Sequence, residues 1–411
     1  MERNDGQSFS QSSFVFISSC PEKWGGSEEL WAQTAIQLAQ DGHQIHVFKT
    51  YIDRAHPRIQ ALSAAGCTLT DLQQLLPWPV RLGNRILRNQ WRYAPIGIQR
   101  LTQTLRKLQP QLTIVSQGNN FDGIIYANVC RLHNHPYVLI AQKAVNFFFP
   151  LDVDRSMIQS VYRSALRCYF VSQHNLALTR QQLSLSLPQA EVVVNPFNVA
   201  FNSADVLPGL QMTSEIHIAC VARLNILDKG QDLLLEVLNQ DKWRARPLYF
   251  TLFGAGPHQH ALDELISFMN LANRVRLGGY VADPTTIWQT HQALILPSRS
   301  EGLPLALVEA MLCGRPAIAT NAGGIAELLL DNVTGFLAAT ASVEALDEAL
   351  ERAWQRRTSW PQLGLQAVRH ARQTIPADAP IRFKNQLLNL INTSIHIPHE
   401  STSSLDHHSY L

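Results

Sequence analysis

Two glutamates eight residues apart follow a short apolar run near the middle of the C-terminal half. Glu301 comes after the run Ala293–Leu296, and Glu309 lies in the apolar stretch beyond it. The run predicts a buried strand and the stretch a helix, with Glu309 about two turns into it. A carboxylate there can accept hydrogen bonds from both hydroxyls of a ribose, and Glu301 can accept them from a sugar.

The residues between the two glutamates predict a tight turn into that helix. They are Gly302, Leu303, Pro304 and Leu305. Glycine and proline shorten the turn, so that the first backbone N–H groups of the helix point outward. A helix start with exposed N–H groups favours an anion such as a diphosphate.

Two cations follow an earlier strand-like run. Arg223 and Lys229 come after the run Ile216–Val221, and Gly230 follows the lysine. Arginine can hold two phosphate oxygens in a planar fork, whereas lysine acts as a mobile point charge. Such a pair is most often surface charge, but its position after a strand and before glycine favours a phosphate site.

Two further loops have the composition of ligand-binding turns. Gly25 and Gly26 follow the strand-like run Phe14–Ser18, where glycine lets the backbone approach a ligand, and Ser27 is a candidate helix N-cap. Val281 stands in the turn after another strand-like run. Neither loop carries a full dinucleotide-binding fingerprint, which argues against a nicotinamide cofactor.

A pair of aspartates has the spacing of a metal-binding motif. Asp152 and Asp154 precede the helical run Ser156–Leu166. Acidic residues favour the first turn of a helix, so the interpretation as helix N-terminal charge is preferred over a metal site.

The order of strand-like and helical segments predicts the architecture. Apolar strand runs alternate with helices in two series, which is typical of parallel βαβ units. We therefore expect an α/β protein with two Rossmann-like, doubly wound domains and a cleft between them. The expected units are a domain at 13–200, a domain at 213–375, a helix at 376–391 returning to the first domain, and a disordered tail at 392–411.

Composition excludes several classes of protein. Of the 411 residues, 46% are hydrophobic and 16% are charged, which is typical of a folded chain with a sizeable core. The formal net charge of +2 gives no case for nucleic acid as a partner. The six cysteines include no C-x-x-C pair, which indicates buried, reduced thiols.

The N-terminus lacks the order of a signal peptide, and no apolar run reaches the roughly 18 residues of a spanning helix. We expect a cytoplasmic protein, at most peripheral at the inner membrane surface. One segment could make that contact, because Arg81, Arg85, Arg88 and Arg92 recur at helical spacing. This face could meet anionic lipid or a phosphorylated acceptor, or could be a solvated arginine face.

The stretch from Pro297 to Leu328 resembles the donor site of the GT-B glycosyltransferases of family 4, also called glycosyltransferase group 1. The resemblance rests on EGLPLALVEAM, CGRPAIAT and NAGGIAEL, followed by DNVTGFL. It implies that Glu301 and Glu309 contact donor sugar and ribose. It also implies that Arg223 and Lys229 neutralise the leaving diphosphate, and that backbone near Val281 reads the base.

The same resemblance implies a retaining transfer from a nucleotide sugar to a hydroxyl of a glycan, lipid or small molecule. It implies no metal and no cofactor besides that co-substrate, and contact of Gly25 and Gly26 with the donor phosphate or the acceptor. Many relatives carry a histidine at the end of a strand in the N-terminal domain. Gln142 and Lys143 stand there instead, and Gln142 could still bond a sugar hydroxyl.

Two other functions stay open. One is a nucleotide-sugar epimerase with the same fold. The other is a non-catalytic relative that binds a glycan or a partner. The absence of the histidine leaves this alternative open. The phosphate clamp formed by Arg223 and Lys229 favours the enzyme, since a scaffold has no use for it.

Overall fold

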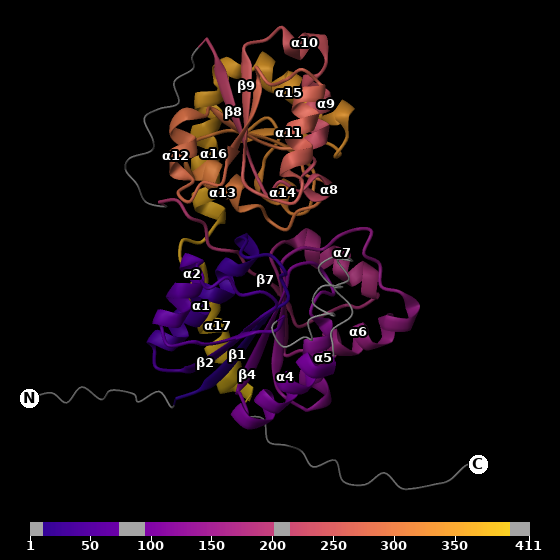
Figure 1. Cartoon of the computed structure of the whole chain (residues 1–411), viewed down its shortest axis with the longest axis vertical. Coiled ribbons are helices and arrows are strands. Elements are labelled where there is room, and N and C mark those ends of the chain that lie inside the picture. The colour runs from indigo at the N-terminus through magenta and orange to yellow at the C-terminus, as the bar shows by residue number, and fades with distance from the viewer. Residues whose placement is uncertain (1–10, 74–94, 201–213, 395–411) are drawn as a thin grey trace, which may run out of the picture.

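The computed structural model describes residues 11–73, 95–200 and 214–394. These residues form two domains, the N-terminal one below and the C-terminal one above in Figure 1. The predicted face from Arg81 to Arg92 lies outside the described residues, as do residues 201–213 between the two domains and the tail from residue 395.

The N-terminal domain contains a seven-stranded sheet in the order β3-β2-β1-β4-β5-β6-β7, and its recorded strand pairs are parallel. The strands are β1 (Ser13–Ser18), β2 (Gln44–Lys49), β3 (Thr68–Asp71), β4 (Leu112–Gln117), β5 (Tyr137–Ala141), β6 (Arg167–Phe170) and β7 (Ala190–Val192). The helices are the 3₁₀ turn η1 (Gly26–Glu28), α1 (Glu29–Gln40), α2 (Pro57–Ala64), α4 (Pro95–Leu108), α5 (Ile124–Leu132), α6 (Asp152–Ser164) and α7 (Gln173–Leu183).

The C-terminal domain repeats this plan with a six-stranded sheet in the order β10-β9-β8-β11-β12-β13. Its strands are β8 (Ile216–Val221), β9 (Leu248–Phe253), β10 (Val275–Gly279), β11 (Ala293–Leu296), β12 (Ala317–Thr320) and β13 (Gly335–Ala338). Its helices are α8 (Ile226–Lys229), α9 (Gln231–Leu238), α10 (Asp241–Arg244), α11 (Gln259–Phe268), α12 (Thr285–Thr290), α13 (Leu305–Leu312), α14 (Ile325–Leu328), α15 (Val343–Gln355), η2 (Arg357–Ser359) and α16 (Trp360–Thr374).

The apolar runs of the sequence form the central strands, as predicted, because parallel strands between two helix layers are buried on both faces. The strands β3 and β13 were not predicted. Each has four residues and stands at the edge of its sheet. The sequence of β3, Thr-Leu-Thr-Asp, has almost no apolar signal, and β13, Gly-Phe-Leu-Ala, is apolar but too short for a clear strand pattern.

All six cysteines are free and buried, as the sequence indicates. Within the described residues, no helix combines the length and apolar character that a membrane span needs.

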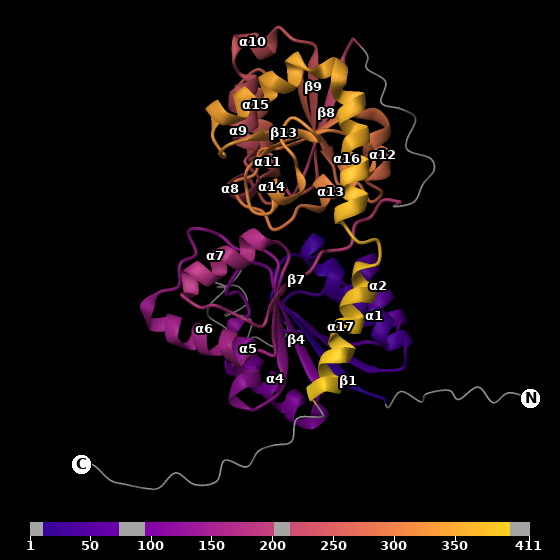
Figure 2. The ribbon, with the colours of Figure 1, turned by 180° about the vertical axis from the view of Figure 1, so that it is seen from behind.

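The last helix, α17 (Ala379–Ser394), crosses back from the C-terminal domain and packs along the N-terminal sheet (Figure 2). Phe383 and Leu387 lie in the same core cluster as residues of α1 and β1. The ring of Phe383 meets that of Tyr169 edge-on at 5.0 Å, and Lys384 pairs with Asp41 at 2.6 Å. The helix continues to Ser394, so residues 392–394 are helical rather than part of a disordered tail.

We predict that Leu387→Ala destabilises the protein by about 2–5 kcal/mol, because it leaves a cavity in the N-terminal core. Leu387 is fully buried, whereas Ile381 on the same helix is 46% exposed. Ile381→Ala is therefore the matched control, with little expected effect. Urea unfolding followed by circular dichroism measures both. Equal losses in the two variants would show that α17 is not part of this core.

Candidate functional site

The loops that carry the predicted motifs gather at one edge of the C-terminal sheet. They follow the carboxyl ends of β8 and β11, where ligands bind in open α/β sheets. Helices α8, α13 and α14 lie on the side of this domain that faces the N-terminal domain, opposite α2 and α7 (Figure 1). The motif residues therefore lie between the two domains.

Lys229 and Glu301 form an ion pair at this edge. The Nζ of Lys229 lies 2.7 Å from Oε2 of Glu301, whose other oxygen accepts a 2.7 Å hydrogen bond from Ser298. Gly230 makes this approach possible. It has φ +61°, and a Cβ there would lie 2.0 Å from the carbonyl oxygen of Pro297. No side chain fits between the end of α8 and the end of β11, so the glycine brings lysine and glutamate together.

Arg223 lies between carboxylates of both domains. It pairs with Glu22 of the N-terminal domain, and its NH2 is 3.5 Å from Oδ2 of Asp228. Burial alone would lower the pKa of Arg223, but Glu22 and the other neighbouring acidic groups raise it overall. Burial also opposes ionisation of Glu22. The charge of Arg223, together with the hydrogen bonds that Glu22 accepts, nevertheless holds the pKa of Glu22 below the usual value. The pair is therefore ionised.

Glu309 is buried one turn into α13. The sequence placed it about two turns in, but the helix starts only at Leu305, so that prediction was wrong. Its Oε1 accepts hydrogen bonds from the backbone N–H of Asn198 at 3.1 Å and from that side chain at 3.4 Å. Burial is the main cause that raises the pKa of Glu309 to about 7.

Glycines let the two domains touch at the turn before α13. A Cβ on Gly302 would lie 2.1 Å from the carbonyl oxygen of Gln142, and one on Gly26 would lie 2.8 Å from the side chain of Leu305. The turn residues Gly302 and Leu305 thus contact the N-terminal domain directly. The N-cap of α13 is Pro304, which has no side-chain acceptor, so the first N–H groups stay available for a ligand.

Ser27 is not the predicted N-cap. It lies inside the turn η1, whose N-cap is Gly25, and the N-cap of α1 is Glu28. Neither position makes a side-chain cap bond. Gly25 and Gly26 occur where the sequence placed them, in the loop after β1 that faces the C-terminal domain.

Several buried polar atoms around the cleft have no hydrogen-bond partner. The Oε1 of Gln142 accepts a 2.7 Å bond from Asn195, but the Nε2 of Gln142 has no partner among the described residues. Other such atoms belong to Asn195, Asn225, Gln231 and Ser300. Since buried polar groups are normally paired, a ligand or water can complete the bonding of these atoms.

Val281 lies in the turn after β10, beside the same apolar cluster as Leu303. Both side chains are partly buried, and Tyr280 next to Val281 is 74% exposed. The two residues come from separate loops, so the cluster joins the turn after β10 to the turn before α13.

Sequence reasoning missed the partners that reach across the cleft. Besides Glu22, the Nζ of Lys143 pairs with Asp228 at 3.1 Å. The carboxylate of Glu327 in α14 accepts the N–H groups of Gln173 and His174 at the start of α7, at 2.9 and 2.7 Å. It thereby caps a helix of the other domain. The only sequence signal for Glu22 and Lys143 is that each of them follows a strand.

Asp152 and Asp154 lie in the first turn of α6, as the helix interpretation requires. Across the described residues, no group of three or more His, Cys, Asp or Glu side chains is arranged to hold a metal ion.

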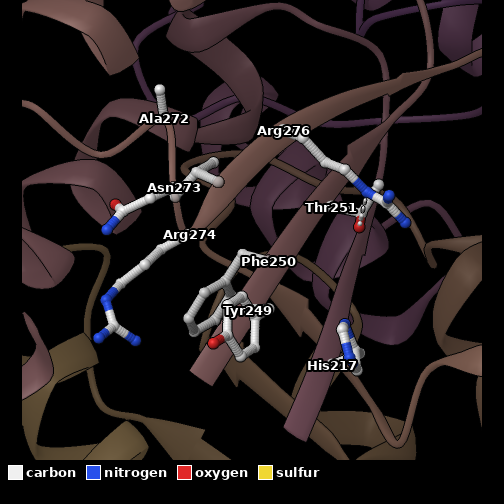
Figure 3. Close-up of a pocket in the computed structure, with 9 residues that line it drawn as sticks. His217, Tyr249, Phe250, Thr251, Ala272, Asn273, Arg274 and Arg276 are labelled. Atoms are coloured by element: carbon white, nitrogen blue, oxygen red, sulfur yellow. Dashed lines mark hydrogen bonds between the residues drawn. The ribbon is translucent and has the colours of Figure 1, made fainter. Parts of the chain in front are cut away.

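A separate cavity of about 210 Å³ lies on the C-terminal domain (Figure 3). It is lined by residues near the amino-terminal ends of β8 and β9, by the segment that leads into β10 and by the first residues of β10, including Tyr249, Arg274 and Arg276. None of the predicted site residues lines it. The motif loops follow the opposite ends of these strands, so this cavity is distinct from the cleft.

Known proteins resemble this chain most clearly in the sequence of its C-terminal domain. Residues 215–356 match the family model described as glycosyl transferases group 1. Alpha-D-kanosaminyltransferase of Streptomyces kanamyceticus is 29% identical over 30% of this chain and 33% of its own length. The 2-deoxystreptamine N-acetyl-D-glucosaminyltransferase of Niallia circulans is 31% identical over 30% and 32%. The match thus spans about a third of these relatives.

Solved structures resemble the whole chain. HepE of Anabaena, in complex with UDP and glucose, superposes with a TM-score of 0.71 at 18% identity, covering 93% of this chain and 100% of that one. Sucrose-phosphate synthase of Thermosynechococcus elongatus gives 0.71 at 16% identity, with the same coverage. Residues 215–356 of the C-terminal domain thus resemble the group 1 glycosyltransferases, and the two domains together have the GT-B fold.

Proposed function

We propose that this protein is a retaining glycosyltransferase that moves a sugar from a nucleotide-sugar donor to a hydroxyl acceptor. One observation carries the proposal. Arg223, Lys229, Glu301 and Glu309 come from the two segments that follow β8 and β11, and they lie at the strand ends that face the other domain. Each has a protein partner in the ligand-free site, and each partner is of the kind that a nucleotide sugar would replace.

The proposed roles follow from the charges. The diphosphate replaces the carboxylates on Arg223 and Lys229, and the start of α13 adds backbone N–H groups to it. Glu301, released from Lys229, accepts hydrogen bonds from the sugar. Glu309 exchanges Asn198 for the two ribose hydroxyls. With the leaving charge neutralised by two side chains, transfer needs no metal, and activity that disappears in EDTA would contradict this.

The acceptor side of the proposal rests on the N-terminal domain. Gln142 has a free amide donor at the cleft, which suits a sugar hydroxyl of donor or acceptor. The acceptor is a hydroxyl of a glycan, a lipid-linked sugar or a small molecule. No side chain is assigned as general base, and in a retaining reaction the leaving phosphate can take the acceptor proton. A product with inverted anomeric configuration, seen by NMR, would rule out the retaining course.

A non-catalytic glycan- or partner-binding role is the second candidate, favoured by Gln142 and Lys143 in place of the histidine that many relatives carry. An epimerase is the third. Incubating the protein with donor alone and with donor plus acceptor distinguishes the three. An epimerase converts the free donor, a transferase needs the acceptor, and a binding protein leaves the donor unchanged in both mixtures.

We predict that one nucleotide sugar among UDP-, GDP-, ADP- and dTDP-sugars stabilises the wild type but not Arg223→Ala. At a concentration of about a hundred times Kd, the stabilisation should reach about 2.7 kcal/mol, measured as a thermal shift. In the transfer assay, Arg223→Ala should lower kcat by about 10²–10³-fold, since it removes a group that stabilises developing charge.

Arg276→Ala is the matched control for this screen, because Arg276 lies at the separate cavity of the same domain. It should bind donor like the wild type. Stabilisation that survives in Arg223→Ala and is lost in Arg276→Ala would place the nucleotide in the cavity of Figure 3 instead of the cleft.

We predict that Glu309→Gln stabilises the ligand-free protein at pH 8 but hardly at pH 5. The pKa of Glu309 is about 7 in the fold, above its usual value of 4.5. The folded state therefore binds this proton more tightly, so ionisation costs stability progressively as the pH rises from 4.5 to 7. The shift corresponds to at most about 3 kcal/mol, which glutamine recovers above pH 7.

Urea unfolding of wild type and Glu309→Gln at the two pH values measures this difference. Glu264→Gln in α11 is the control, because that side chain is 69% exposed. The stabilised Glu309→Gln should also lose affinity for nucleotide, since the amide has one acceptor oxygen where the carboxylate offers two charged ones to the ribose hydroxyls. An equal effect on stability at pH 5 and pH 8 would show that Glu309 does not carry the buried charge.

A further inference from the structure

Lys143 is a buried cation that the N-terminal domain directs at the phosphate site. It lies two residues after the end of β5, and its residue exposure is only 8%. Its Nζ lies 3.1 Å from Oδ2 of Asp228, and Asp228 immediately precedes Lys229 in α8. The ammonium group of Lys143 in the N-terminal domain therefore lies against the segment of the C-terminal domain that carries Arg223 and Lys229.

The Oδ2 atom of Asp228 marks a point where two cations converge. It lies 3.1 Å from Nζ of Lys143 and 3.5 Å from NH2 of Arg223. An anionic oxygen at this point is held from both sides of the cleft. The carboxylate of Asp228 thus stands where the oxygen of a phosphate would be held equally well, and a phosphate carries more negative charge.

The burial of Lys143 fits a ligand-binding role better than a structural one. Burial lowers its pKa below the usual value, Asp228 offsets part of that shift, and Lys229 adds to it. A buried ammonium beside another lysine, with one carboxylate that it shares with Arg223, is under-neutralised. A diphosphate supplies the missing negative charge.

We propose that Lys143 is the third cationic group of the diphosphate site, and that it binds the phosphate next to the transferred sugar. This proposal rests on the function proposed above. Arg223 and Lys229 belong to the C-terminal domain alone, whereas Lys143 arrives from the acceptor side. The complete cation set therefore exists only while the two domains face each other as they do here, and the leaving group is stabilised only in that arrangement.

The proposal has a distinctive consequence for nucleotide selectivity. A group that binds the phosphate next to the sugar contributes to a nucleoside diphosphate and not to the corresponding monophosphate. Hydrogen bonds to charged groups give about a ten- to hundredfold effect on affinity. We expect Lys143→Ala to weaken the diphosphate by that factor and to leave the monophosphate unchanged.

Isothermal titration calorimetry tests this with UDP, GDP, ADP and dTDP, each beside its monophosphate. The variants are Lys143→Ala, Lys143→Gln, Lys143→Arg and Asp228→Asn. Lys143→Arg should keep most of the diphosphate preference, because it keeps the charge. Lys23→Ala is the control, since Lys23 is an exposed lysine of the loop after β1 that pairs with Asp53. Unchanged monophosphate binding shows that a variant is folded.

Asp228→Asn separates the proposal from a purely structural salt bridge. If Lys143 only ties the domains together, both variants break the same bridge and weaken the diphosphate alike. If Lys143 binds phosphate, Asp228→Asn removes a competing carboxylate and the diphosphate binds at least as tightly as to the wild type. Equal losses in Lys143→Ala and Asp228→Asn, or equal losses of di- and monophosphate in Lys143→Ala, overturn the proposal.

The failure of the proposed function gives a different result. In that case the wild type binds none of the four diphosphates in the titration. A wild type that binds one of them while Lys143→Ala binds it equally well leaves the donor site standing and overturns only the role of Lys143.

Discussion

The site depends on charge that is balanced across the cleft. Arg223 meets Glu22 and Asp228, Lys143 meets Asp228, and Lys229 meets Glu301. Taking these groups out of water is costly unless each finds an opposite charge. Without ligand, the protein's own carboxylates supply that charge. Two of the cations that would bind a diphosphate, Arg223 and Lys143, thereby also join the two domains.

Close backbone approach makes this balance possible. Gly230 lets the end of α8 reach the end of β11, and Gly302 lets the turn before α13 meet the carbonyl of Gln142. A Cβ at either place would lie only 2.0 or 2.1 Å from a backbone carbonyl oxygen, so a larger residue would push the segments apart. Helix α17 follows the C-terminal domain in the chain and packs into the N-terminal core. The C-terminal domain is therefore tied to the N-terminal domain at both of its ends, and the chain as well as the charges keeps the facing surfaces together.

The sequence predicted most of the fold and the C-terminal part of the site, for a physical reason. Central parallel strands are continuous apolar runs, and the loops after them carry Arg223, Lys229 and Glu301 in local patterns. The edge strand β3 has too little apolar signal, and β13 has only four residues, which is too short for a clear strand pattern. Glu22, Lys143 and Asn198 were missed because their partners lie in the other domain, and no local spacing encodes a contact between domains. Ser27 failed as an N-cap because the chain turns two residues earlier, at Gly25.

A crystal structure with the nucleoside diphosphate that gives the largest thermal shift tests the central claim most directly. The account predicts the phosphates between Arg223 and Lys229, with the carboxylates of Glu22 and Asp228 displaced and the ribose hydroxyls on Glu309. A nucleotide bound elsewhere, with the Glu22–Arg223 and Lys229–Glu301 pairs intact, would contradict it.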